Sequence, residues 1–146
     1  MVDQRRYRLF VYGTLLDGEP DHELLDGASL LGAARTTARY KLVEVRASAG
    51  LIDTGDTAVV GELYELDAPT LAKCDIKREH PVLYRRRRVE LDDGTEALAY
   101  FLSPDQARGC RRVRDGNWRE RFVAKPTADS ARGPFTQWTR SRYSRK

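Results

Sequence analysis

The sequence predicts a single α+β domain made mainly of β-strands, on three observations. The chain has 146 residues, which suits one domain with a buried core. About six or seven short segments have the alternation, or the β-branched and aromatic content, of strands. Only two short segments carry helix signals. Many short strands at regular spacing favour a closed or partly closed sheet, because closure removes exposed edges.

Each element has a local justification. Asp21 and Asp67 are placed to cap short helices, and Pro69 suits the first turn of the second one. Asp93-Gly94 predicts a hairpin turn, whereas small residues and turn signals over 47–56 predict loop. The expected elements are strands 8–12, 29–34, 37–45, 58–66, 83–91 and 96–102, with helices over 21–25 and 68–76.

The net charge of +4 belongs to the C-terminal end of the chain. Residues 126–146 hold five basic residues and one acidic residue, and residues 1–125 are balanced. We therefore expect a domain over 1–125 and a basic tail over 126–146. Such a tail either stays disordered or docks on the domain. Contact with nucleic acid is the less favoured alternative, since Phe135, Trp138 and Tyr143 also suit docking.

Several function classes fit the sequence poorly. It has no apolar run of about 18 residues and no export signal at its N-terminus, so we expect a cytoplasmic protein without a membrane partner. Cys74 and Cys110 stand apart, which predicts reduced thiols and not a disulfide framework. The two histidines, His22 and His80, form no metal-binding motif, and no nucleophile elbow or phosphate-binding loop is present. The sequence leaves the oligomeric state open.

Two stretches carry candidate chemistry. The first is Tyr12-Gly13-Thr14-Leu15, where a strand meets a glycine. It reads either as an ordinary strand end or as a concavity of free amides that binds a carboxylate. The second is the polar loop after the second helix, where Glu79 is a candidate proton shuttle. Four consecutive arginines, Arg85–Arg88, follow it, and on a strand two of them point to each face.

Four motifs together resemble the gamma-glutamylcyclotransferase-like family over about residues 8–119. They are Val11-Tyr12-Gly13-Thr14-Leu15, His22-Glu23-Leu24-Leu25, Gly61-Glu62-Leu63-Tyr64-Glu65-Leu66 and Pro81-x-x-Tyr84-Arg85-Arg86. The sequence is most similar to the small bacterial branch that includes the cyclotransferase of butirosin biosynthesis. This resemblance implies a small mixed β-barrel of six or seven strands with two or three short helices.

The resemblance also implies a reaction. Members cleave gamma-glutamyl amides intramolecularly: the substrate's α-amine attacks its own γ-carbonyl and releases 5-oxoproline and a free amine. Closing a five-membered ring within one molecule has a large entropic advantage, so no cofactor or metal is expected. A single carboxyl group can take the proton and return it. The substrate-binding residues that we predict are Tyr12, Gly13, Thr14, Leu15, Arg78 and Tyr84.

The sequence departs from the family at the shuttle itself. The usual motif, Asp-x-x-Glu-Gly-x-Pro, aligns without a gap so that Arg78 takes the glutamate position and Glu79 the glycine position. We predict Glu79 as the catalytic residue, with Glu62 as the reserve candidate. Arg78 could instead bind an acidic group of the substrate. The leading prediction is a gamma-glutamyl cyclotransferase, and the alternative is a non-catalytic small-molecule binding domain on the same fold.

Overall fold

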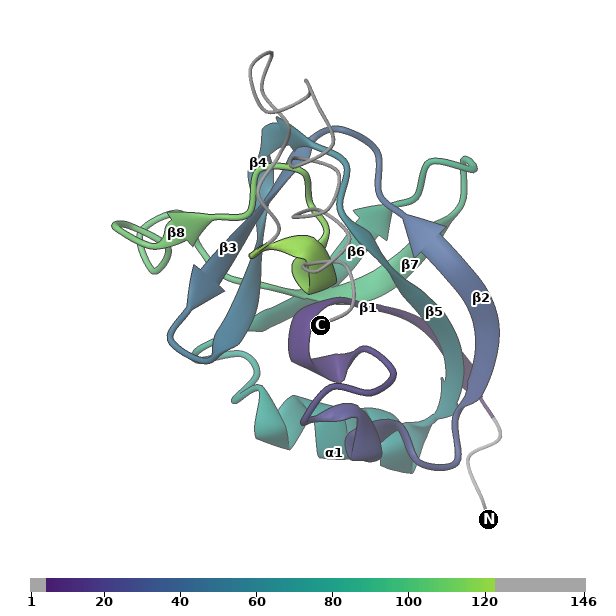
Figure 1. Ribbon diagram of the computed structural model, residues 1–146. Helices are drawn as coiled ribbons and strands as arrows, with labels where there is room; N and C mark the ends of the chain where they lie inside the picture. Colours follow the sequence, from purple (N-terminus) through teal and green to yellow (C-terminus); the bar gives the residue numbers. More distant parts are fainter. Residues whose placement is uncertain (1–4, 123–146) are drawn as a thin grey trace, which may run out of the picture.

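The computed structural model describes residues 5–122 (Figure 1). Its eight strands form one mixed sheet in the order β2-β5-β1-β7-β4-β3-β8, and β6 pairs with β7. β1 and β4 run parallel to β7, and the other pairs are antiparallel. The strands are β1 Arg6–Val11, β2 Ser29–Arg35, β3 Tyr40–Val45, β4 Ser48–Thr57, β5 Val60–Asp67, β6 Arg85–Glu90, β7 Glu96–Phe101 and β8 Arg111–Arg112.

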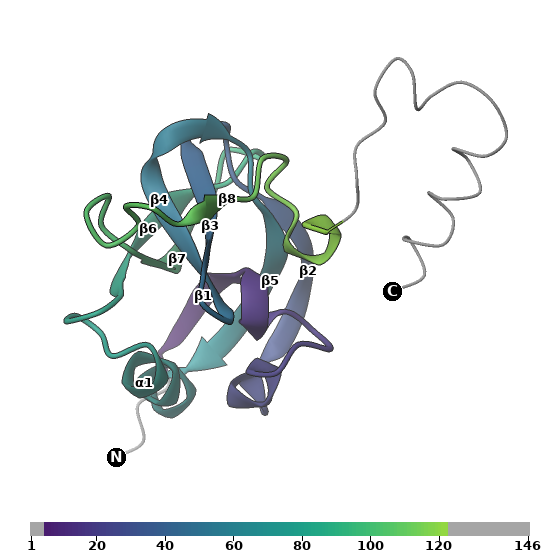
Figure 2. The same cartoon turned by 60° about the vertical axis from the view of Figure 1, so that its left-hand side comes forward.

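The prediction of a mixed sheet with few helices is confirmed, but a closed barrel is not. Among residues 5–122 the edge strands β2 and β8 do not pair with one another, so the curved sheet stays open. One α-helix, α1 Ala68–Lys77, accompanies it, together with three short 3-10 helices, η1 Gly13–Leu15, η2 His22–Leu25 and η3 Trp118–Glu120. Figures 1 and 2 both show η2 and α1 at the same end of the sheet, and the two elements contact each other.

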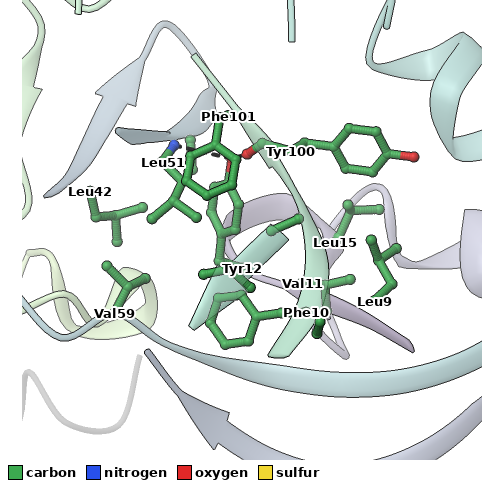
Figure 3. Close-up of a cluster of buried hydrophobic side chains, with 14 of the residues drawn as sticks. Leu9, Phe10, Val11, Tyr12, Leu15, Leu42, Leu51, Val59, Tyr100 and Phe101 are labelled. Atoms are coloured by element: carbon green, nitrogen blue, oxygen red, sulfur yellow. Dashed lines mark hydrogen bonds between the residues drawn. The ribbon is translucent and has the colours of Figure 1, made fainter. Parts of the chain in front are cut away.

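The hydrophobic core is built largely from the most apolar strands. β1 lies between β5 and β7, and its last three residues, Leu9 to Val11, are almost fully buried. Figure 3 shows Tyr12 near Leu51 and Phe101, inside this apolar cluster. The apolar end of β1 is thus buried between two neighbouring strands, in agreement with its central place in the sheet.

Helix α1 is built as its sequence predicts. The Asp67 carboxylate accepts a hydrogen bond from the amide of Thr70 at 2.9 Å, and this N-cap, with backbone bonding there, holds its pKa below the usual range. Farther along, Asp75 forms an ion pair with Arg86 of β6 and accepts a hydrogen bond of 2.7 Å from the Tyr100 hydroxyl. These contacts fix the C-terminal half of α1 on the sheet.

Two expectations change in the structure. Residues 48–57 form one long strand, β4, although the sequence predicted loop there: residues 48–52 pair with β3, and the residues that carry the turn signals, 53–56, lie in a register shift of that pairing. The expected helix after Asp21 is a single 3-10 turn, and Asp21 makes no side-chain cap bond. The basic tail over 126–146 lies outside the described residues. No helix within residues 5–122 is long and apolar enough to cross a membrane.

Candidate active site

The turn after β1 is fixed by Gly13. Its φ is +63°, and a Cβ atom there would lie 2.4 Å from the Cβ of Ala49 on β4. Glycine is therefore required for both the backbone conformation and the close approach of the strand. The Leu16 amide donates to the Gly13 carbonyl at 3.1 Å, and the Leu15 amide to the Tyr12 carbonyl at 3.4 Å. These two amides close the turn and are not bonded to the sheet, and the binding of a carboxylate by the amides after Gly13 stays a prediction.

Tyr12 holds this turn against the sheet. Its hydroxyl accepts a hydrogen bond of 3.1 Å from the Leu51 amide and donates to the carbonyl of Tyr100 at 2.5 Å. Burial raises the pKa of Tyr12 far above the ordinary value, which keeps the hydroxyl protonated as a donor. The side chain thereby links β1 to β4 and β7, and it does not line the cavity described below.

Arg78 follows the last turn of α1 and points inward. It is only 7% exposed. Its Nη1 donates to Ser48 Oγ at 3.1 Å, and its Nη2 donates to Thr14 Oγ1 at 3.0 Å. The guanidinium also lies over the Tyr84 ring, 5.2 Å from its centroid. A buried charge needs partners, and these contacts supply them from three separate parts of the chain.

Asp21 completes a network with these groups. The Thr14 hydroxyl donates to Asp21 Oδ2 at 2.7 Å, and Arg78 Nη2 lies 3.8 Å from the same oxygen. Lys77 Nζ lies 4.0 Å from the other oxygen, Oδ1. The backbone amide of Asp21 donates to the Thr14 carbonyl at 2.8 Å, which holds the loop in place. Sequence reasoning considered Asp21 only as a helix cap; its shared loop with Thr14 was the available signal.

A cavity of about 650 Å³ opens beside this network. Its charged lining comes from Asp21, Arg46, Lys77 and Arg78, and Thr14, Ser48 and Gln106 add polar groups. Its apolar lining comes from Pro20, Val45, Ala47, Leu83 and Tyr84. Such a volume with a few converging polar groups is typical of a small-molecule site. The single negative side chain among the lining residues is Asp21.

Tyr84 forms part of the cavity wall. Its hydroxyl donates to the Ala49 carbonyl at 2.7 Å, and Ala49 is also the residue against which Gly13 packs. The ring is thus fixed between β4 and the Arg78 guanidinium. Of the six predicted substrate-binding residues, the structure brings Thr14, Arg78 and Tyr84 to the cavity, while Tyr12, Gly13 and Leu15 support Thr14 from behind.

Glu79 lies apart from this network. The residue is exposed, its φ is +53°, and it is not among the residues that line the cavity. Its carbonyl accepts the amides of Val82 and Leu83 at 2.8 and 2.9 Å, so its backbone forms the turn that precedes β6. Glu79 as the proton shuttle stays a prediction that requires this loop to rearrange.

Glu62, the reserve candidate, holds a different part of the loop after β1. Its Oε1 accepts the Asp17 amide at 2.9 Å and the Tyr64 hydroxyl at 3.1 Å, and its Oε2 lies 3.4 Å from Arg119 Nη2. Burial and the Glu62 charge raise the pKa of Tyr64 well above its ordinary value. Glu62 does not line the cavity, and its contacts are those of a structural carboxylate.

Neither the Cys74 thiol nor a cluster of metal ligands provides a reactive site in residues 5–122. Cys74 is buried in α1, and this burial raises the pKa of its thiol to about 11, so the reactive thiolate is scarce near neutral pH. Within that range no group of three or more His, Cys, Asp or Glu side chains is arranged to hold a metal ion. The titratable groups of the cavity are therefore the candidates for chemistry.

Known proteins are similar to this chain in sequence and in fold. The family model described as gamma-glutamyl cyclotransferase, AIG2-like, matches residues 9–120. A Vibrio cholerae protein described as "Putative gamma-glutamylcyclotransferase" is 36% identical over 116 residues, covering 80% of this chain and 98% of that protein. A Methanocaldococcus jannaschii protein with the same description is 33% identical over 96 residues, covering 64% of this chain and 80% of that protein.

Solved structures share the fold. The c4763 protein of uropathogenic Escherichia coli superposes with a TM-score of 0.71 at 25% identity, over 80% of this chain and 95% of that one. The ytfP protein of Escherichia coli gives a TM-score of 0.61 at 29% identity, over 76% and 95% of the two chains. The match to the family model spans the sheet, α1 and the loop that carries Thr14. This chain belongs to the gamma-glutamyl cyclotransferase family of the AIG2-like type.

Proposed function

We propose that this protein is a gamma-glutamyl cyclotransferase that cleaves a small gamma-glutamyl amide to 5-oxoproline and a free amine. The observation that carries the proposal is the cavity beside Thr14, where a carboxylate and a buried guanidinium stand 3.8 Å apart. A gamma-glutamyl compound offers an ammonium and a carboxylate on one carbon atom, which match these two charges. Family membership supports the reaction class.

The reaction requires only two contributions from the protein, which are to position the substrate and to transfer protons. The nucleophile is the substrate's own α-amine and the electrophile is its γ-carbonyl, so the cavity has to fold the substrate and bring the two together. It also has to remove a proton from the ammonium and supply one to the leaving nitrogen. The apolar wall around Leu83 and Tyr84 leaves space for the amine portion of the substrate.

The test is incubation of the full-length protein with a panel of gamma-glutamyl amides, with 5-oxoproline measured by mass spectrometry. The matched control is each amide with its α-amine acetylated, because a blocked amine cannot attack. We expect 5-oxoproline from the free amides alone. Absence of 5-oxoproline across the panel would exclude the proposed activity for those substrates.

One observation favours a second candidate, a non-catalytic domain that binds a small carboxylate. Arg78 occupies the position where the family places its glutamate, and its guanidinium lines the cavity while Glu79 does not. This candidate predicts saturable binding of gamma-glutamyl amides, followed by calorimetry, without any turnover. Turnover of one panel member above the acetylated control rules it out.

A further inference from the structure

Asp21 is the carboxylate that the cavity offers for proton transfer. It is the one acidic residue of the lining, and its side chain is 22% exposed, so a ligand can reach it. Although Asp21 precedes η2 in the N-cap position, its side chain makes no cap bond and is directed to Thr14 instead. An N-cap aspartate usually stabilises the helix end by a hydrogen bond to its backbone amides. Asp21 does not make that bond, and its contact with Thr14 places the carboxylate in the cavity.

The hydrogen bonds around Thr14 show that the Asp21 carboxylate acts as a hydrogen-bond acceptor. The hydroxyl has one hydrogen, which it donates to Asp21 Oδ2, and its oxygen accepts from Arg78 Nη2. Asp21 is thus presented as an acceptor. Its second oxygen, Oδ1, is 4.0 Å from Lys77 Nζ, beyond hydrogen-bond distance, and remains able to accept from a ligand.

Arg78 has donors to spare for a substrate carboxylate. A guanidinium carries five N–H groups, and Ser48 and Thr14 use two of them here. Lys77 and Arg46 add positive charge to the same lining. An α-amino acid head group therefore meets a cation that suits its carboxylate and an anion that suits its ammonium.

We propose that Asp21 is the proton shuttle of this enzyme and that Arg78 holds the substrate α-carboxylate. The inference rests on the proposed cyclotransferase activity. Asp21 takes a proton from the α-ammonium, and the freed amine attacks the γ-carbonyl carbon to form the lactam C–N bond. Asp21 returns this proton to the leaving nitrogen as the bond from that carbon to the leaving nitrogen breaks, and Asp21 then carries the second proton of the attacking nitrogen to the departing amine. In total two protons pass from the attacking to the leaving nitrogen, and none is released.

The position of the charges explains why Arg78 is compatible with activity. At the end of α1 the carboxylate of the family motif is replaced by a cation, and Asp21, across the Thr14 hydroxyl, supplies an anion within the same cavity. The proton acceptor has moved from the end of the helix to the loop after η1. Glu79 is then free to serve as an exposed turn residue.

Three variants test the assignment by 5-oxoproline release. Asp21→Asn keeps the size and the Thr14 contact but removes the base, so turnover should fall by about 100-fold or more. Glu79→Gln should keep the wild-type rate. Asp26→Asn is the matched control, since Asp26 is an exposed aspartate of the same segment outside the cavity. Full turnover in Asp21→Asn, or its loss in Glu79→Gln, overturns the proposal while the cyclotransferase activity stands.

Binding of the product gives a second, independent measurement. 5-Oxoproline has the carboxylate but no ammonium, so it should bind Asp21→Asn at least as tightly as the wild type by calorimetry. Arg78→Gln should weaken this binding by about 10-fold or more, since a charge-assisted contact is lost. Weaker binding to Asp21→Asn would mean that the variant has damaged the cavity, and unchanged binding to Arg78→Gln would contradict the carboxylate assignment. If the wild type releases no 5-oxoproline, the proposed function fails first.

Discussion

Two carboxylates, Asp21 and Glu62, hold the loop after β1 at different points and have opposite surroundings. Glu62 is saturated: a backbone amide, a tyrosine hydroxyl and an arginine use both of its oxygens. Asp21 accepts one side-chain hydrogen bond, from Thr14, and keeps an oxygen available at the cavity. A carboxylate whose oxygens are both used holds structure, whereas one with an unused oxygen at a cavity can contact a ligand, and this difference is the basis of the roles proposed for the two residues.

The largest effect on stability should come from substitution of Gly13, which fixes the turn after β1. Gly13→Ala places a Cβ 2.4 Å from that of Ala49 and forces an alanine to φ +63°. We expect the free energy of unfolding to fall by about 2–4 kcal/mol. Denaturant titration measures it, and Gly18→Ala is the control, because Gly18 also has positive φ but nothing within 4 Å of its added Cβ. Equal losses in the two variants would show that close packing at Ala49 is unimportant.

Removal of Glu62 should cost stability and spare the reaction. Glu62→Ala leaves the Asp17 amide and the Tyr64 hydroxyl without their acceptor, which should lower the free energy of unfolding by about 1–3 kcal/mol. Turnover, assayed well below the melting temperature, should stay close to that of the wild type. Glu65→Ala, on the same strand, is the control for loss of a carboxylate. A stable but inactive Glu62→Ala would reverse the roles assigned to the two carboxylates.

The accessibility of the Cys74 thiol tests the alternative proton shuttle, Glu79, which lies close to it at the end of α1. The carbonyl of Cys74 accepts the Arg78 amide at 2.9 Å, so a rearrangement that turns Glu79 inward disturbs the helix end beside this thiol. In the observed arrangement the pKa near 11 leaves little thiolate at pH 8, and its fraction rises only as the pH approaches that value. In a Cys110→Ser variant we expect labelling by a thiol reagent only on unfolding.

If substrate accelerates that labelling in the folded protein, the loop that carries Glu79 opens during binding, and Glu79 is again a candidate for the proton shuttle. Protection or no change supports Asp21. The labelling rate of the Cys110→Ser variant in denaturant provides the reference for full exposure of Cys74.

The smallest effect should be on the ionisation of Tyr64. Burial first, and then the Glu62 charge, raise its pKa above the ordinary value of 10.0. The folded state therefore retains this proton when the unfolded state has lost it, and stability declines as the pH rises above about 10. Glu62→Gln should lower the pKa of Tyr64, which ultraviolet difference titration against the wild type detects. Asp21→Asn should leave that difference unchanged.

Much of the framework could be predicted from local sequence. The apolar run of β1, the capped start of α1 at Asp67 and the hairpin at Asp93-Gly94 each depend on neighbouring residues, and each appears in the structure. β4 was missed because pairing with β3 draws residues 48–52 into a strand, which no local signal records, while the turn residues 53–56 lie in a register shift of that pairing. Sheet closure could not be predicted either, since it depends on whether two edge strands meet.

By itself the sequence determined the order of the motifs, the glycine turn before Thr14 and the presence of an arginine where the family places a glutamate. Only the tertiary structure decided which side chains share the cavity. Asp21 and Arg78 are far apart along the chain and meet because η2 packs against α1, and the Thr14 hydroxyl then links them. A side chain turns toward its best hydrogen-bond partner in space, and for Asp21 that partner is Thr14, not the helix it precedes.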